Sequence, residues 1–209
     1  MDYPRFFDDV QKIRLYDPLA QFLGATSDGI LEYGYFDAVR MAGHSCPTVA
    51  GAYLATLKAL AFLYREGLPE RGGIRVEFRD ERQNGVTGVI ASVVTLMTGA
   101  TQDNGFKGIG GRFDRRDRLY FGCGFEADMR FARIDNGATV DVTYHADRVG
   151  AAPGMVALLP KVLAGGATSE EHRVFRDLWQ DRVRRILIDN FDDAEMLVLS
   201  ESPVPTERE

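Results

Sequence analysis

The stretch PTVAGAYLATLKALAFLYREG, residues 47–67, decides the fold because it is apolar on almost every face. Its opening proline suits the first turn of a helix, and its closing glycine suits the end of one. A helix without a polar face must be surrounded by other elements. We therefore predict a central helix here, with the rest of the chain packed around it.

Alternating and helical patterns flank this central helix on both sides. GILEYGY and GIRVEFRD alternate as strands, FDAVRMAG has the pattern of a short helix that ends at Gly43, and GVTGVIASVVTLMTGA reads as a second apolar helix. Three later strands are expected in DRLYFGCGF, DMRFARI and ATVDVTYH, with a turn at 135–137 between the last two. Helices in GMVALLPKVL and SEEHRVFRDLWQDRVRRILID then precede a final strand, AEMLVLSE.

Helices on one face of a largely antiparallel sheet predict an α+β fold. We expect a single domain over residues 1–209 with its core at about 29–200. Residues 1–28 are expected to form a helical extension, because RFFDDVQKIRLYDPLAQFLG reads as an amphipathic helix broken at Pro18. Residues 201–209 are expected to be a polar tail.

Composition limits the classes of partner. The 209 residues carry a net charge of −6, and no cluster of Lys and Arg is interleaved with aromatic residues, which argues against nucleic acid. No apolar run approaches the roughly 20 residues of a membrane span, and no signal peptide is visible. The two cysteines do not make a disulfide framework, so we expect a cytoplasmic protein.

The stretch MAGHSCPT, residues 41–48, carries the most reactive pair of side chains, His44 and Cys46. A thiolate at the start of a helix is stabilised by the helix dipole, and sulfur with imidazole favours a transition metal, zinc above all. The alternative is a buried cysteine and a hydrogen-bonded histidine at a tight turn. Two ligands do not complete a tetrahedral site, so distant residues must supply the rest.

The candidates for further ligands are few. Cys123 lies on the apolar face of a predicted strand and could equally be a core thiol. His145 falls on the polar face of another strand, where a solvated side chain is the simpler interpretation. Asp114 could supply an oxygen ligand, although charged residues beside a strand end are usually solvated.

The glycine-rich loop TQDNGFKGIGGRF could bind an anion through backbone N–H groups and a lysine. It matches no nucleotide-binding signature, and a turn crowded by the core explains it equally well. Its candidate binding residues are Asn104, Gly105, Lys107, Gly108, Gly110 and Gly111.

Three segments in order resemble the FmdE family of formylmethanofuran dehydrogenase components. AGHSCPTVAGAYLATLKAL is similar to its G-H-x-C-P-G segment and following helix, and NGVTGVIASVVTLMTGATQDNGFKGI to its second block. GGRFDRRDRLYF is similar to the later R-D-Y-G-K stretch, with Asp114 at the aspartate position, so the likeness covers about residues 36–122. The chain departs from the family at Asn84 and Ala100, where the family has cysteines, and at Thr48, where it has glycine.

The resemblance implies an α+β domain like that of FmdE and of the C-terminal domain of glyceraldehyde-3-phosphate dehydrogenase, assembled as a homodimer. It also implies that His44 and Cys46 are metal ligands, zinc being the expected ion. The leading hypothesis is therefore a metal-binding protein of undefined activity that acts on a small molecule at an open metal site. The alternatives are a non-catalytic sensor, carrier or accessory protein for a metal or cofactor, and a degenerate structural homologue.

Overall fold

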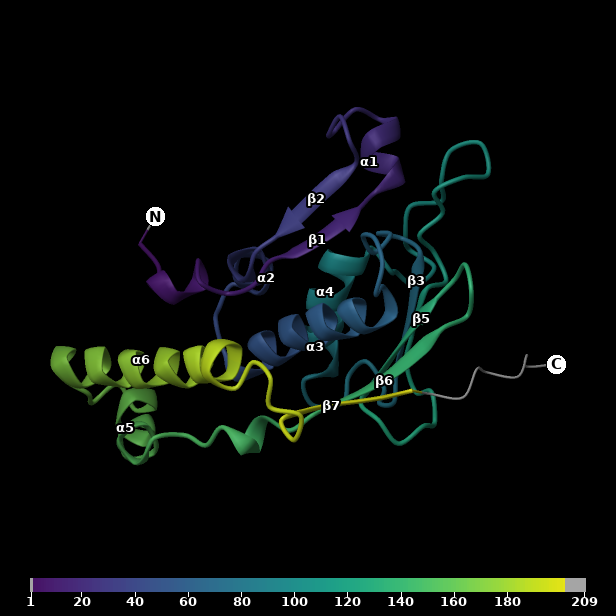
Figure 1. The fold of residues 1–209 in the computed structure, drawn as a ribbon. Coiled ribbons are helices and arrows are strands. Elements are labelled where there is room, and N and C mark those ends of the chain that lie inside the picture. Colours follow the sequence, from purple (N-terminus) through teal and green to yellow (C-terminus); the bar gives the residue numbers. More distant parts are fainter. Residues whose placement is uncertain (1, 202–209) are drawn as a thin grey trace.

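The central helix of the fold is α3 (Pro47–Leu63), which lies against a five-stranded sheet in a computed structural model that describes residues 2–201 (Figure 1). Twelve of its 17 residues are buried, and it contacts strands β5 (Met129–Arg133) and β6 (Thr139–Tyr144). The prediction of a buried central helix is confirmed.

The sheet has the order β4-β3-β5-β6-β7, in which β3 is Ile74–Phe78, β4 is Leu119–Tyr120 and β7 is Leu197–Glu201. All neighbours are antiparallel except β3 and β4, which are parallel, so the sheet is mixed. Alternate residues of β3 are buried, as expected for a strand with one face on the core. The predicted α+β fold is confirmed.

Two further helices pack on α3. Helix α4 (Thr87–Thr98) contacts both α3 and α2 (Tyr35–Ala42). Each ends at a glycine in the left-handed region, Gly43 with φ 76° and Gly99 with φ 72°. Glycine adopts this conformation without steric strain, which explains why the two helices end there.

The predicted N-terminal helical extension is wrong. The chain instead forms a short 3₁₀ turn (Arg5–Phe7), strand β1 (Ile13–Tyr16), the one-turn helix α1 (Pro18–Phe22) and strand β2 (Ile30–Tyr33). Ile13 and Leu15 are buried on one face of β1, which pairs with β2 in a separate antiparallel ribbon. The strand pattern of Ile13–Tyr16 extends over only four residues. The apolar residues before and after it also fit the period of a helix, so the sequence pattern indicated a helix.

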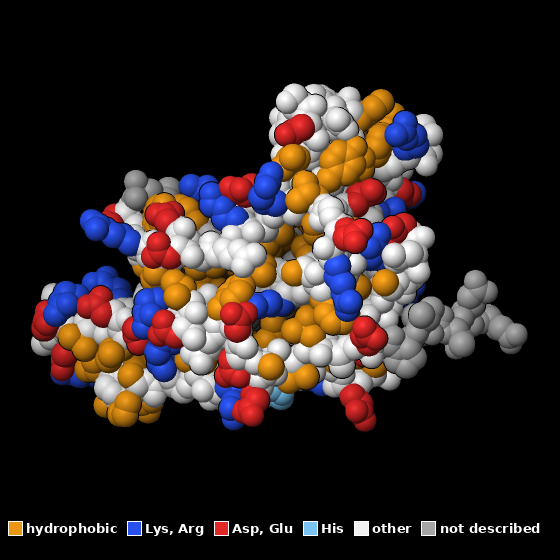
Figure 2. Space-filling view, viewed as in Figure 1, with side chains coloured by type: hydrophobic (Ala, Val, Ile, Leu, Met, Phe, Trp, Pro, Cys, Tyr) orange, Lys and Arg blue, Asp and Glu red, His pale blue; other side chains and the backbone are white. Residues whose placement is uncertain are grey.

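A projecting arm follows the sheet. Helices α5 (Pro153–Leu163) and α6 (Ser169–Arg184) form a hairpin that extends away from the body (Figure 1). A 3₁₀ turn (Ala146–Arg148) precedes the arm, and a π-helical turn (Arg185–Asp189) follows it. Hydrophobic side chains are visible on the outside of the arm (Figure 2).

The expected strand DRLYFGCGF is mostly irregular, and only Leu119–Tyr120 pair with β3. Gly122, with φ 67°, takes the chain out of the extended conformation two residues after the last paired residue, Tyr120. Within residues 2–201, no helix is both long and apolar enough to cross a bilayer. The predicted polar tail, apart from Glu201, lies outside the residues that the structure describes.

Candidate functional site

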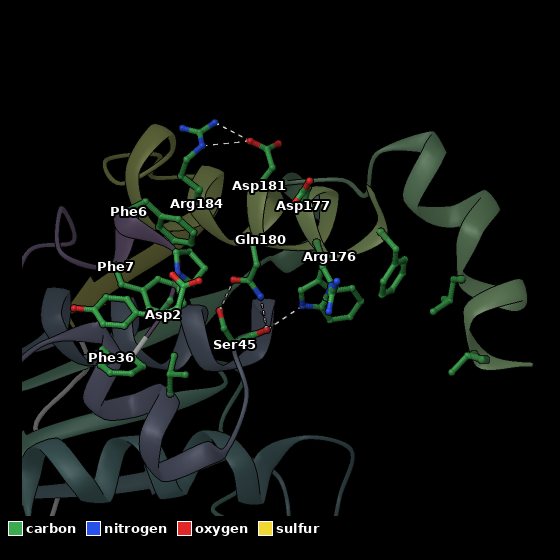
Figure 3. A pocket seen from close by; sticks show the side chains of 17 residues that line it. Asp2, Phe6, Phe7, Phe36, Ser45, Arg176, Asp177, Gln180, Asp181 and Arg184 are labelled. Carbon is green, nitrogen blue, oxygen red and sulfur yellow. Dashed lines mark hydrogen bonds and ion pairs between the residues drawn. The ribbon is translucent and has the colours of Figure 1, made fainter. Parts of the chain in front are cut away.

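The HSC turn, residues 44–46, joins α2 to α3 and is held by side chains of α2 and of α6. The Ser45 hydroxyl donates to Gln180 Oε1 of α6 at 2.9 Å (Figure 3). The Tyr35 hydroxyl of α2 lies 3.0 Å from the same Ser45 oxygen and donates to it, since the serine proton is already committed. The Trp179 indole N–H donates to the Ser45 carbonyl at 2.9 Å. The turn is therefore fixed by tertiary contacts.

The two predicted metal ligands of this turn lie in different environments. His44 is exposed, and its Nδ1 lies 3.0 Å from the Ala42 carbonyl oxygen. Cys46 is 9% exposed and belongs to the apolar core. Burial raises the pKa of Tyr35 and Tyr144, and negative charge on the nearby Cys46 sulfur raises both further. The imidazole is thus open to solvent while the thiol is buried in the core.

The weaker ligand candidates are placed on other elements. Cys123 is half-buried, with its sulfur 3.7 Å from the Phe121 carbonyl oxygen. His145 is exposed after the end of β6, and Asp114 is bound by the Arg116 guanidinium at 2.7 and 3.1 Å. Across the described part of the chain, no three His, Cys, Asp or Glu side chains are grouped closely enough to hold a metal ion. A metal site remains a prediction.

The predicted anion-binding loop, residues 104–111, projects beside the β1–β2 ribbon and closes on itself (Figure 1). Ile109 and Arg112 exchange backbone hydrogen bonds of 2.9 and 3.0 Å. Gly108 has φ 85°, and a Cβ there would lie 2.2 Å from the Arg112 carbonyl oxygen. Only glycine fits at this position, so the residue is explained by the turn itself.

The other members of this loop do not converge on one cavity. Asn104 lines a 280 Å³ pocket against α4, whereas Lys107, Gly110 and Gly111 are exposed. Gly105 packs against Thr101, whose hydroxyl oxygen would lie 1.8 Å from an added Cβ. Anion binding by the loop therefore stays a prediction.

The base of the loop is anchored by a buried ion cluster. Asp17, 3% exposed, accepts from Arg115 Nη2 at 2.8 Å and from Arg71 Nη1 at 3.1 Å. Burial by itself raises the pKa of Asp17, but the Ala20 N–H and the two guanidiniums outweigh it and hold that pKa below its ordinary value. The cluster ties the loop to the β1–β2 ribbon.

A 460 Å³ cavity, which we call the Tyr144 pocket, lies where α3, α4 and three strands of the sheet meet. Its floor is apolar and is formed by Phe78, Ile90 and Met129. Its polar lining comes from the starts of α3 and α4 and from residues next to the strand ends: Thr48, Asp80, Asn84, Thr87, Asp128 and Tyr144.

Tyr144 forms the wall between this pocket and α3. Its ring occupies the space above Gly51, where an added Cβ would lie 2.1 Å from Tyr144 Cε1. Its hydroxyl donates to the Pro47 carbonyl at 3.1 Å, and its backbone N–H donates to Asp128 Oδ2 at 2.9 Å. Because Gly51 has no side chain, the Tyr144 ring of β6 can pack directly against the backbone of α3.

The charges around the Tyr144 pocket nearly cancel. Arg79 bridges both carboxylates, with Nε 3.1 Å from Asp80 Oδ1 and Nη2 3.0 Å from Asp128 Oδ1. The hydrogen bond to Asp80 is the main cause that raises the pKa of Arg79, so the guanidinium stays charged. No side chain caps the N-terminus of α3 or of α4 among the residues described, and each helix start carries about half a positive charge.

Sequence reasoning placed His44 and Cys46 first and missed this pocket. Thr48 and Asn84, two of the positions that depart from the FmdE pattern, line the same cavity. Asp128 and Tyr144 had no distinguishing motif, because each directly flanks or ends an ordinary strand. Only the pairing of β5 with β6 brings them together.

The chain matches no protein-family model and no curated protein. Resemblance to the FmdE family therefore stays a prediction from its motifs, and function has to be argued from the geometry of this chain.

Proposed function

We propose that this protein binds a small zwitterionic molecule, such as an amino acid, in the Tyr144 pocket. The observation that supports this most is that two uncapped helix starts and two carboxylates bridged by one arginine line the same cavity. The volume of 460 Å³ lies within the roughly 300–1,000 Å³ typical of small-molecule sites.

The arrangement suggests how such a ligand would lie. A carboxylate group would accept from the free N–H groups of the first turn of α3, next to Thr48, and would face the positive end of the α4 dipole. The Thr87 N–H of α4 is not available, because it donates to the Asn84 carbonyl oxygen at 3.0 Å.

An amino group would donate to Asp80, whose second carboxylate oxygen lies beyond the one that binds Arg79. Asp128 is the less available acceptor, because its Oδ1 binds Arg79 and its Oδ2 accepts from the Tyr144 N–H. Asn84 can serve either end, because its amide both donates and accepts.

Calorimetric titration with free amino acids and with 2-hydroxy acids tests the proposal. We expect at least one amino acid to bind saturably, and Asn84→Leu to weaken it about tenfold or more by removing a hydrogen-bonding group from the lining of the pocket. Asn104→Leu, a change to an exposed asparagine outside the pocket, is the matched control and should bind as wild type does. Equal affinity of Asn84→Leu and wild type, or saturation by none of the amino acids, would contradict the proposal.

We propose a second function, binding of a transition metal at the HSC turn, because His44 has the orientation of a ligand. A metal-bound histidine commonly donates its other ring N–H to a backbone carbonyl, as Nδ1 can do here toward the Ala42 oxygen. Nε2 then keeps its lone pair for an ion, with zinc expected. Cys46 would join it after a local rearrangement of the turn, in a reducing cytoplasm that preserves the thiol.

Elemental analysis of untagged protein tests this second proposal, and exchange with a chelator then separates a carrier from an open catalytic ion. We expect one metal ion per chain in wild type and in His145→Ala, an exposed-histidine control, and loss of the metal in both Cys46→Ser and His44→Ala. Transfer to a mild chelator would favour a carrier, and retention would favour an open catalytic ion. Wild-type protein without stoichiometric metal would leave only the Tyr144 pocket proposal.

A further inference from the structure

Two segments far apart in the sequence form a projecting tip of the molecule. Residues 18–27 comprise α1 and the turn after it, and residues 104–113 form the glycine-rich loop (Figure 1). The rings of Phe22 and Phe113 join the two segments, with their centroids 5.2 Å apart. The buried ion cluster, which lies next to each segment in the sequence, anchors both. We call residues 18–27 and 104–113 together the apolar tip.

The apolar tip exposes large hydrophobic side chains on both of its segments. Phe22 is 57% and Leu23 61% exposed on the first, and Phe106 is 42% and Ile109 43% exposed on the second. Hydrophobic side chains lie next to a basic one on this projection (Figure 2). Single exposed apolar residues are ordinary on a protein surface, but a group of them at one projecting end indicates a contact surface.

The same tip is positively charged in a protein that is acidic overall. The whole chain has a net charge of −6, yet the two segments contain Lys107 and Arg112 and no Asp or Glu. Both cations are exposed, and neither has an ion-pair partner within the described residues, whereas Arg116 just outside the tip is paired. The carboxylates that flank the segments in sequence, Asp28 and Asp103, lie outside the tip. A matching occupant therefore offers an apolar phase together with negative charge.

We propose that the apolar tip docks on an anionic lipid bilayer. The interface of such a bilayer places negative headgroups directly over hydrocarbon, which matches exposed Phe, Leu and Ile side chains beside Lys and Arg. A flat, deformable lipid surface also accepts a convex tip, whereas a protein partner would need a pocket shaped to receive it. Because no helix within residues 2–201 is long and apolar enough to cross a bilayer, the contact would be peripheral.

The shape of the tip is set before any contact is made. The backbone hydrogen bonds between Ile109 and Arg112, of 2.9 and 3.0 Å, close the loop, so docking orders little additional chain. No residue of the tip lines the Tyr144 pocket. Lipid docking and ligand binding in that pocket can therefore fail independently of each other.

Co-sedimentation of the full chain with lipid vesicles tests the proposal. We expect binding to vesicles of mixed phosphatidylcholine and phosphatidylserine, and much weaker binding to phosphatidylcholine alone. Leu23→Glu and Ile109→Glu should each lower the partition coefficient about tenfold or more, because a charge replaces a side chain that enters the apolar layer. Leu163→Glu, at a 77% exposed leucine on the α5–α6 arm, is the matched control and should bind as wild type does. All three positions are exposed, so the variants should keep the wild-type circular dichroism spectrum.

Reversing one charge tests the electrostatic part of the proposal. Lys107→Glu should lower binding to the mixed vesicles about fivefold or more at low salt, and by less at high salt. Arg176→Glu is its matched control, since Arg176 is an exposed arginine of α6 without an ion-pair partner in the described part of the chain.

Three results would overturn the proposal. Absence of binding to the mixed vesicles would leave the tip as a contact for a protein. Equal losses for Leu163→Glu and Leu23→Glu would show that the tip is not the docking surface. Binding that is the same for both kinds of vesicle and unaffected by Lys107→Glu would show that anionic lipid is not recognised.

Discussion

Helices α3 and α5 begin alike and are placed in opposite environments. Each begins with proline, and each is apolar over most of its length. Yet α3 buries 12 of its 17 residues and α5 buries one of 11. The comparison shows that apolar composition predicts a helix, but does not predict whether it is buried. The position of the helix in the fold decides whether other elements of the same chain pack on its apolar side chains.

The difference follows from what lies on each side of the two helices. The sheet lies on one side of α3, and α2 and α4 lie against it as well. Among the described residues, helix α5 packs mainly against α6, in the arm (Figure 1). Stability of the central body should therefore depend on α3 and hardly at all on the outer face of α5.

Truncating one leucine in each helix should give the largest contrast. Leu54→Ala removes a side chain that is 1% exposed and should lower the free energy of unfolding by about 3 kcal/mol. Leu163→Ala removes one that is 77% exposed and should change it by less than about 0.5 kcal/mol in the monomer. Urea denaturation at low protein concentration measures both. Similar losses for the two variants would mean that α5 is part of the core.

Replacing one glycine by alanine in each helix should change the free energy of unfolding less, and in opposite directions in the two helices. Gly51→Ala places a Cβ 2.1 Å from the Tyr144 ring, and this overpacking should destabilise the fold by about 2 kcal/mol. Gly154→Ala in α5 meets only the flexible end of Leu178 at 3.3 Å and should stabilise by about 0.5 kcal/mol through helix propensity. Thermal unfolding followed by circular dichroism compares them. A neutral Gly51→Ala would show that the Tyr144 ring moves easily.

The smallest effect concerns the polar contacts that close the arm. Glu171 accepts from Lys161 of α5 at 2.5 Å and from the Thr168 N–H at 2.7 Å, and the lysine contact is the main cause that lowers its pKa to about 2. A lowered pKa contributes stability above the unfolded pKa of about 4.3, and that contribution is lost as the pH falls toward 2.

Glu171→Gln should therefore raise amide exchange in the arm at pH 7 by less than about tenfold, with no change in α3, because the pair is exposed. Arm stability in wild type and variant should converge as the pH falls below 4. The matched control is Glu170→Gln, since Glu170 pairs with Arg173 of its own helix and does not contact α5. A pH-independent difference would show that shape, and not charge, holds the hairpin.

The sequence predicted long elements better than short ones. The apolar pattern of α3 extends over 17 residues and fits only a buried helix. The short segment around Ile13 and Leu15 fits either a strand or one face of a helix. Its pairing with β2 makes it a strand. The strand expected around Cys123 was cut short by Gly122, whose positive φ no periodicity reveals. At the site, chemistry drew attention to His44 and Cys46, while Asp80, Asp128 and Tyr144 are recognisable only once three strands are side by side.

The sequence by itself determined that this protein has an apolar central helix, an α+β arrangement and a histidine and a cysteine two residues apart at the start of that helix. These features follow from local periodicity, helix-end chemistry and side-chain type, which act over a few residues. The tertiary structure alone decided that Cys46 is enclosed while His44 is exposed, that Thr48 and Asn84 share a cavity, and that α5 is left uncovered. Each of these depends on which distant segments become neighbours, and strand order and helix packing fix that for the chain as a whole.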